Sequence, residues 1–139
     1  FYSQALNKEE AIEEANYVLT LVKPYNITYP IAIDVEAIEN DSFRQENLSA
    51  SELTDVIIAF CDTIKAAGYT PLIYSNLLYF MDNVELERLE GYDKWFAGYQ
   101  TASPYYPYKY AMWQYTSTGS INGVSGNVDI NIAMKNLKK

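Results

Sequence analysis

The chain has 139 residues, of which 49% are apolar and 20% are charged, and its 18 acidic side chains outnumber the 10 basic ones. This composition excludes a wholly disordered chain, and no apolar run approaches the ~20 residues of a membrane-spanning helix. The net charge of −8 argues against nucleic acid or an anionic membrane as a partner, because the long-range field of the protein repels polyanions.

The residue inventory also restricts the chemistry. The chain has no histidine and a single cysteine, Cys61, which excludes Ser-His and Cys-His catalysis and an intrachain disulfide. Carboxylates without histidine suit Ca²⁺ or Mg²⁺, but no segment has the acid density of an EF-hand loop, so we expect neither metal nor cofactor. The 14 tyrosines each combine an apolar ring with a polar tip, which suits either a sugar-binding groove or the rim of an ordinary core.

The first third of the chain predicts a strand, a helix and a second strand. Residues 1–3 read as the tail of a strand. Asn7 and Glu10 have the spacing of an N-cap and its capping-box partner, and Pro24 ends the helix near residue 22. Apolar residues recur between them at helical spacing, at Ala11, Ile12, Ala15, Val18, Leu19 and Val22. The β-branched run 29–35 predicts a buried strand of a parallel sheet.

The middle third repeats this alternation. Residues 40–47 are polar and loop-like, Ser49 and Glu52 form a second capping-box signature, and Gly68 suits the position after the end of that helix. Residues 71–75 predict another strand. Residues 76–89 predict a helix in two short pieces, broken near residues 82–83.

The last third loses its helices. Two aromatic-rich strands are predicted at 94–99 and 110–115, separated by a loop rich in Pro and Tyr at 101–108. Residues 116–127 predict a turn or hairpin, 128–130 a short strand, and 135–139 a basic tail. With no repeat and no linker, the pattern predicts one α/β domain with parallel pairing and a helix-poor C-terminal third.

Asp34 and Glu36 form the most suggestive pair of acids. They stand at i and i+2 at the end of a predicted strand, so both side chains point to one face, with Cα atoms roughly 6.5–7 Å apart. Active sites of α/β folds lie at the carboxyl ends of strands. Close carboxylates cannot both ionise freely, and glycoside hydrolysis needs such a pair. The tripeptide is also common by chance, and solvated acids often end strands.

Asp129 is the other acid of interest. It lies inside the apolar strand 128–130, just after a glycine-rich turn. A lone acid in such a run is either functional or paired with backbone donors. The glutamates of the predicted helices, in contrast, fit solvated faces.

Five motifs in order resemble glycoside hydrolase family 25, the Chalaropsis-type lysozymes. They are Tyr-Pro-Ile-Ala-Ile-Asp34-Val-Glu36, Tyr-Thr-Pro-Leu-Ile-Tyr74-Ser, Trp95-Phe-Ala-Gly-Tyr99, Trp113-Gln-Tyr-Thr-Ser-Thr-Gly119 and Gly126-Asn-Val-Asp129-Ile-Asn131. The resemblance covers essentially the whole chain and implies an irregular, TIM-like β/α barrel.

The resemblance implies an N-acetylmuramidase that cleaves the β-1,4 bond between N-acetylmuramic acid and N-acetylglucosamine in peptidoglycan. It assigns Glu36 as the proton donor. Asp34 would assist the substrate's N-acetyl group or stabilise charge at the anomeric carbon, and Asp129 would shape and polarise the site.

The resemblance also places aromatic residues of the strand ends in the sugar groove. The expected substrate-binding residues are Tyr2, Tyr74, Trp95, Tyr99, Trp113 and Gln114. Trp95 and Tyr99 share one face of their strand. Trp113 and Gln114 are adjacent, so only one of them can point into the groove, and the sequence leaves open which one.

One departure from the family pattern concerns the N-terminus. The family barrel begins with a strand that carries another active-site Asp, whereas residue 1 of this chain corresponds to the family's third strand. We therefore expect residues 1–139 to form a partial, N-terminally incomplete catalytic barrel. Its exposed sheet edge favours self-association, and it would be weakly active or inactive unless the missing part is supplied.

The expected partner is the glycan strand of peptidoglycan, with neither nucleic acid nor membrane. Family members are secreted or are phage endolysins, so the resemblance implies action at the cell wall, with no signal peptide in this span. The alternative is a non-catalytic, glycan-binding remnant of such a barrel.

Overall fold

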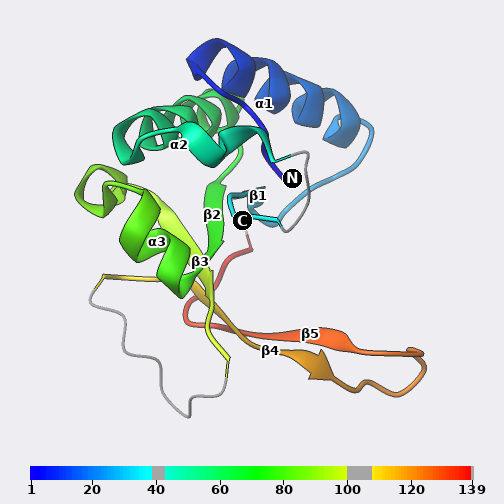
Figure 1. Cartoon of the computed structure of the whole chain (residues 1–139). Coiled ribbons are helices and arrows are strands. Elements are labelled where there is room, and N and C mark those ends of the chain that lie inside the picture. Colours follow the sequence, from blue (N-terminus) through cyan, green and yellow to red (C-terminus); the bar gives the residue numbers. More distant parts are fainter. Residues whose placement is uncertain (39–42, 100–107, 139) are drawn as a thin grey trace.

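The computed structural model describes residues 1–38, 43–99 and 108–138 (Figure 1). The helical elements are α1 (Lys8–Val22), the 3-10 turn η1 (Arg44–Asn47), α2 (Ala50–Ala66), α3 (Leu77–Asn83) and the 3-10 turn η2 (Leu86–Leu89). The strands are β1 (Ile31–Asp34), β2 (Pro71–Asn76), β3 (Asp93–Ala97), β4 (Met112–Gly119) and β5 (Val128–Ala133).

The strands form one five-stranded sheet in the order β1-β2-β3-β4-β5, curled into a half-barrel. Neighbouring strands from β1 to β4 are parallel, and β5 returns antiparallel to β4 as a hairpin that projects from the helical part (Figure 1). Residues 1–3 run beside β1, where Tyr2 forms a parallel bridge with Asp34. The predicted α/β class, the parallel pairing and the helix-poor final third are confirmed.

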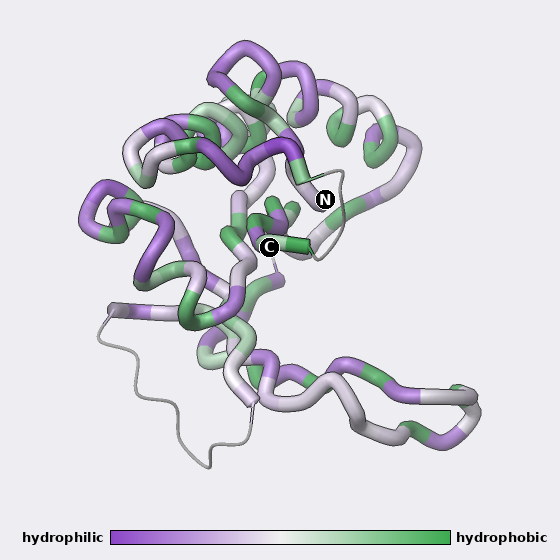
Figure 2. Tube along the Cα trace, in the orientation of Figure 1, coloured by the Kyte–Doolittle hydropathy of each residue, from purple (hydrophilic) through white to green (hydrophobic). Residues whose placement is uncertain are grey.

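One face of the sheet is covered chiefly by α2, which packs against β1 and β2, and α1 packs on that helix. Side chains that are fully shielded from solvent form this core, among them Ile33, Phe60, Ile73 and Phe96. Both helices alternate between hydrophilic and hydrophobic residues, as an amphipathic helix requires (Figure 2). In the described ranges, no helix combines the length and hydropathy needed to cross a bilayer.

The helix ends follow the capping signals with one exception. Ser49 and Glu52 form a complete capping box at α2, and Gly68, with φ +89°, adopts the left-handed backbone that glycine tolerates best. At α1, Asn7 accepts the Glu10 backbone N–H. The Glu10 carboxylate does not complete the expected box, because it accepts the N–H of Leu6 and pairs with Arg44 instead.

Two element predictions need correction. The buried residues of α1 are Ala11, Ala15 and Val18, while Ile12 is exposed. The helix packs against α2 through these small side chains. The hairpin predicted at 116–127 is present between β4 and β5, but residues 116–119 belong to β4, since they pair with β5 across register shifts. The predicted break near residue 83 is confirmed by the division into α3 and η2. The predicted loop 101–108 lies, except for Tyr108, outside the described residues.

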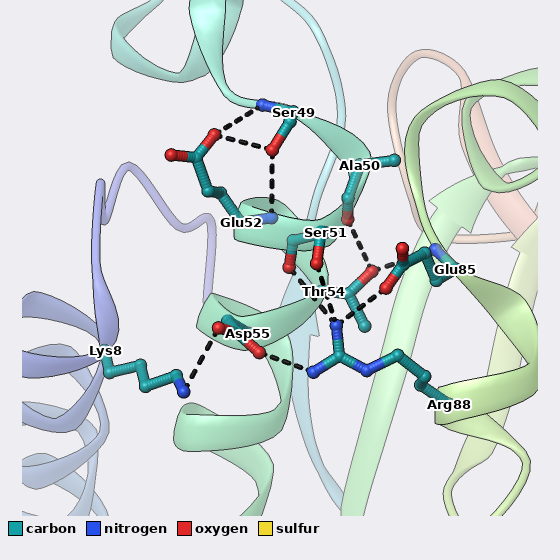
Figure 3. Close-up of polar contacts among 9 residues, drawn as sticks. All are labelled: Lys8, Ser49, Ala50, Ser51, Glu52, Thr54, Asp55, Glu85 and Arg88. Carbon is teal, nitrogen blue, oxygen red and sulfur yellow. Dashed lines mark hydrogen bonds and ion pairs between the residues drawn. The ribbon is translucent and has the colours of Figure 1, made fainter.

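A polar network ties the helical elements together at the surface (Figure 3). Arg88 of η2 pairs with Asp55 of α2 and with Glu85, and Lys8 of α1 reaches the other oxygen of Asp55 at 3.1 Å. Thr54 Oγ1, on the same helix, accepts the Glu85 backbone N–H at 2.9 Å. The network therefore fixes the segment after α3 to the first turns of α2.

Candidate active site

The predicted carboxylates meet in one cavity of about 350 Å³ near the carboxyl ends of the parallel strands. It is lined by Phe1, Ala32, Asp34, Glu36, Tyr74, Trp95, Gln114 and Asp129. β1 and β5 lie at opposite ends of the strand order, yet each contributes an acid to this cavity. The curl of the sheet is therefore what brings Asp129 to the same cavity as Asp34 and Glu36.

Strand register explains why the site forms on one face. Asp34 is paired with Tyr74, and Tyr74 with Trp95, so the three side chains form a row across adjacent strands. These residues are half-buried, whereas their chain neighbours Ile33, Ile73 and Phe96 point to the opposite face and are shielded from solvent. Alternation along each strand thus separates the candidate site from the core.

Backbone contacts hold the end of β1 in place. The Val35 N–H donates to the Tyr74 carbonyl at 3.0 Å, and the buried Ser75 hydroxyl donates to the Val35 carbonyl at 2.5 Å. The Tyr2 hydroxyl donates to the Glu36 carbonyl at 3.3 Å. The peptide that carries both acids is therefore attached to β2 and to residues 1–3. This role of Ser75 was not predicted, because the sequence does not indicate which serine of a strand bonds to a neighbouring strand.

The electrostatics of the pair favour protonation. Burial, reinforced by the Glu36 charge and opposed by the amino group of Phe1, raises the pKa of Asp34 to about 6. Burial also raises the pKa of Glu36. Asp34 Oδ1 is buried and has no hydrogen-bond partner among the described residues. A pair of this kind holds a proton at higher pH than isolated carboxyl groups do, which favours general acid catalysis.

Asp129 has a different environment. It is exposed on β5, an edge strand of the described sheet, although it lines the cavity. Asp129 can therefore contribute negative charge to the cavity, in a more solvated position than the other two acids.

A tyrosine–glutamine cluster forms the cavity wall next to the acids. Gln114 Oε1 accepts the hydroxyl of Tyr74 at 2.9 Å and that of Tyr99 at 2.6 Å, and its residue is only 3% exposed. The Tyr74 and Trp95 rings meet edge to face, with centroids 4.7 Å apart. The predicted aromatic residues of β2 and β3 are thus brought together, and the amide of β4 connects Tyr74 to Tyr99.

The structure answers the question left open at Trp113 and Gln114. Gln114 points to the cavity, while Trp113 belongs to the core, is 8% exposed and donates its indole N–H to the Gly98 carbonyl at 2.8 Å. The expected placement of Trp113 in the groove is therefore wrong, because adjacent strand residues point to opposite faces. Tyr2 and Tyr99 are not among the residues that line the cavity, but Tyr2 bonds to the Glu36 backbone and Tyr99 bonds to Gln114.

Asn131 is a neighbour of the cavity that the sequence-based set of site residues omits. The Trp95 indole Nε1 donates to its Oδ1 at 2.8 Å, and Asn131 is paired with Gln114 in the sheet. A signal for it existed. Asn131 stands two residues after Asp129, so the same alternation that groups Asp34 with Glu36 places it on the face of Asp129.

Two larger cavities, of about 470 and 460 Å³, lie at the opposite end of the sheet and share Gly91, Tyr92, Asp93 and Lys135. Two of the charged groups that line both cavities, Lys135 and Asp93, pair with each other at 2.6 Å. Asp34, Glu36 and Asp129 line neither of these cavities. Within the described part of the chain, no group of three or more Asp, Glu, Cys or His side chains is arranged to hold a metal ion. The smaller cavity is therefore the candidate active site.

Comparison with known proteins agrees with the fold and gives a family match. The model of glycosyl hydrolases family 25 matches residues 1–124. An autolytic lysozyme of Clostridium acetobutylicum is 24% identical over 125 residues, which cover 90% of this chain and 36% of that protein. A lysozyme of Streptococcus phage Cp-7 is 32% identical over 121 residues, which cover 80% of this chain and 33% of that protein.

Solved structures show the same fold. The modular autolysin LytC from Streptococcus pneumoniae, determined in complex with a synthetic peptidoglycan ligand, matches with a TM-score of 0.81 and 29% identity, over 94% of this chain and 32% of that one. A bacterial lysozyme from Streptomyces coelicolor matches in fold with a TM-score of 0.70 and 22% identity, over 90% of this chain and 61% of that one. The chain thus spans about a third of the length of the curated relatives given above.

Proposed function

Because the chain belongs to glycosyl hydrolase family 25, a family of peptidoglycan-hydrolysing lysozymes, we propose that it cleaves the β-1,4 bond between N-acetylmuramic acid and N-acetylglucosamine. The observation that carries this proposal is the gathering of Asp34, Glu36 and Asp129 in one cavity beside Tyr74 and Trp95. Carboxylates supply acid catalysis and charge stabilisation, and aromatic rings supply surfaces for sugar rings. Residues 1–139 would accordingly be catalytic-domain sequence.

In the proposed mechanism, Glu36 donates a proton to the glycosidic oxygen as the bond to the leaving sugar breaks. Its raised pKa supports this role, because the group must be protonated when substrate binds. Asp34 would then orient the substrate's N-acetyl group or stabilise positive charge at the anomeric carbon, to which a water molecule adds to complete the hydrolysis. Asp129, on the last strand of the sheet, would add negative charge to the cavity.

Two carboxylates compete for the role of donor. The pKa of Asp34 rises to about 6, so on electrostatics alone Asp34 is also suited to hold a proton. The family motif favours Glu36. This residue lies two positions beyond the carboxyl end of β1, whereas Asp34 is the last residue of the strand. The assignment of Glu36 as donor rests on the motif and needs a test that separates the two acids.

The test compares Glu36→Gln with Asp34→Asn across pH. The variants are compared within a complete family barrel, with purified peptidoglycan as substrate and release of reducing ends as the measurement. Glu36→Gln should lose about 10²- to 10⁴-fold in rate and the basic limb of the pH–rate profile. Asp34→Asn should lose rate but keep that limb. Glu9→Gln, at an exposed position of α1, is the matched control and should behave as the unaltered chain.

If Asp34→Asn loses the basic limb and Glu36→Gln keeps it, Asp34 is the proton donor. Undiminished hydrolysis by Glu36→Gln would refute the proposed mechanism. Binding of glycan by the unaltered chain without any release of reducing ends would support the alternative of a glycan-binding remnant.

The proposed partner and site of action follow from the relatives. The LytC structure contains a peptidoglycan ligand, and other matching structures are described as endolysins, one of them from a bacteriophage of Listeria monocytogenes. We therefore propose peptidoglycan glycan strands as the substrate and the cell wall as the place of action. Self-association through the sheet edge stays a prediction.

A further inference from the structure

The indole of Trp95 is held by a side chain two strands away. Trp95 lies on β3 and Asn131 on β5, with β4 between them, and the indole Nε1 donates to Asn131 Oδ1 at 2.8 Å. Both residues are half-buried. An indole has one polar group, and that group is a donor only. This bond therefore uses the whole hydrogen-bonding capacity of Trp95.

A second contact restricts the same ring. Tyr74 meets Trp95 edge to face, with an interplanar angle of 63°, and Tyr74 is itself fixed by its bond to Gln114. A tryptophan side chain has two torsions, and contacts with β2 on one side and β5 on the other restrict both. The indole is thereby ordered before any ligand arrives, which lowers the entropic cost of binding.

We propose that Asn131 is a positioning residue that holds the Trp95 indole as a rigid, apolar stacking surface for a pyranose ring of the glycan. The inference deepens the proposed function and rests on it. With its N–H engaged, the indole offers a sugar its ring surface and no hydrogen bond. Polar recognition of the sugar is then left to other groups of the cavity, such as Asp34, Glu36 and Asp129.

The chain supplies an internal control for testing the hydrogen bond. It contains two tryptophans, and the indole N–H of Trp113 donates to the backbone carbonyl of Gly98, which a side-chain substitution at Asn131 leaves in place. Asn131→Leu removes the acceptor at similar size, and Asn131→Asp keeps an acceptor. The measurement is hydrogen exchange of the two indole N–H groups by NMR, with signals assigned through Trp95→Phe.

Asn131→Leu should accelerate exchange of the Trp95 indole about fivefold, the size expected for one net hydrogen bond, and leave the Trp113 indole unchanged. Asn131→Asp should restore slow exchange. Equal acceleration at both indoles would show that the substitution loosens the whole fold, which contradicts a local positioning role. Equal exchange of the Trp95 indole in all variants would overturn that role as well.

The second measurement is binding of a soluble glycan fragment of alternating N-acetylglucosamine and N-acetylmuramic acid, by calorimetry, on the same 139-residue chain. Asn131→Leu should weaken binding about fivefold. In the Trp95→Phe background, which lacks the indole donor, the same substitution should change affinity less than twofold, since the two residues act as a pair.

These results separate the two proposals. If the unaltered chain binds no glycan, the proposed function fails, and the stacking role of Trp95 fails with it. If the unaltered chain binds and Asn131→Leu binds equally well despite a freed indole, only the present inference fails. Equal losses of affinity in the unaltered and the Trp95→Phe backgrounds would assign Asn131 a direct contact with sugar instead of a positioning role.

Discussion

Trp95 and Phe96 are neighbours in β3, yet they belong to two different environments. Phe96 is fully shielded on the face that the helices cover and meets Tyr110 edge to face at 4.8 Å. Trp95 is half-buried on the other face, where it contacts Tyr74 and Asn131. The first face is held together by close packing of apolar groups, and the second by hydrogen bonds between aromatic and amide side chains.

The difference shows how one strand contributes to both stability and function. Burial of apolar area is non-directional, so many apolar side chains would serve on the helix-covered face. The hydrogen bonds of the cavity face depend on particular atoms, because Gln114 must accept two hydroxyls and Asn131 one indole N–H. Substitutions on the two faces should therefore differ in kind as well as in size.

The largest effect on stability should come from Phe96→Ala. The substitution leaves a cavity in the core and should lower the free energy of unfolding by about 3–5 kcal/mol, measured by urea denaturation. Trp95→Ala, one residue away, should cost clearly less stability and should abolish most glycan binding. Equal destabilisation by the two substitutions would contradict the proposed division between the faces.

Much of the helix-covered face could be predicted from the sequence. The capping box at Ser49 and the apolar run of β2 depend on neighbours within a few residues, so local rules suffice. The exposure of Ile12 could not be foreseen, since it depends on how closely α1 approaches α2. The extension of β4 to Gly119 depends on pairing with β5, and pairing across a hairpin overrides the turn signal of a small-residue segment.

The cavity face was predictable only as a set of candidate residues. The i, i+2 spacing of Asp34 and Glu36 identified one shared face, and the same rule applied to Asp129 would have included Asn131. For Trp113 and Gln114, alternation required that one side chain point away from the cavity, but it did not determine which one. The strand register decides, because Gln114 is paired with Ala97 and thus shares the face of Trp95. Such cross-strand contacts are invisible to single-sequence reasoning.

Gln114→Leu should have the next largest effect. It removes the acceptor of two tyrosine hydroxyls, and because Tyr99 is 44% exposed and can bond to water, the loss of stability should be about 2 kcal/mol. Glycan binding should weaken as well. The matched control is Gln45→Leu, at an equally buried glutamine that donates to the Ala5 carbonyl. That variant should lose stability without losing affinity, and weaker binding in both would argue against a special role for Gln114.

The Asp34 carboxylate should make stability depend on pH. Its folded pKa of about 6 lies above its ordinary value of 3.8, so between these two pH values the folded state holds a proton that the unfolded state has lost. The free energy of unfolding should therefore fall as pH rises from about 4 to about 6, and then stay level with respect to this group. Because the carboxylate is partly solvated, the fall should be about 1 kcal/mol. Urea denaturation of Asp34→Asn should no longer show this fall in the free energy of unfolding between pH 4 and pH 6. If the variant shows the same pH dependence as the unaltered chain, groups other than Asp34 cause the fall.

The smallest effect should come from Arg88→Met, far from the cavity face. Arg88 pairs with Asp55 and Glu85 in the network of Figure 3, but all three side chains are accessible to water, where ion pairs contribute little net stability. The urea midpoint should decrease slightly at low ionic strength, and the difference from the unaltered chain should vanish at about 0.5 M salt, where screening is strong. Glycan affinity should be unaffected, because the network joins helices on the covered side and touches no described residue of the cavity. A salt-independent loss would mean that the aliphatic part of Arg88 stabilises the fold by packing, and a change in affinity would show that the two faces are coupled through α2.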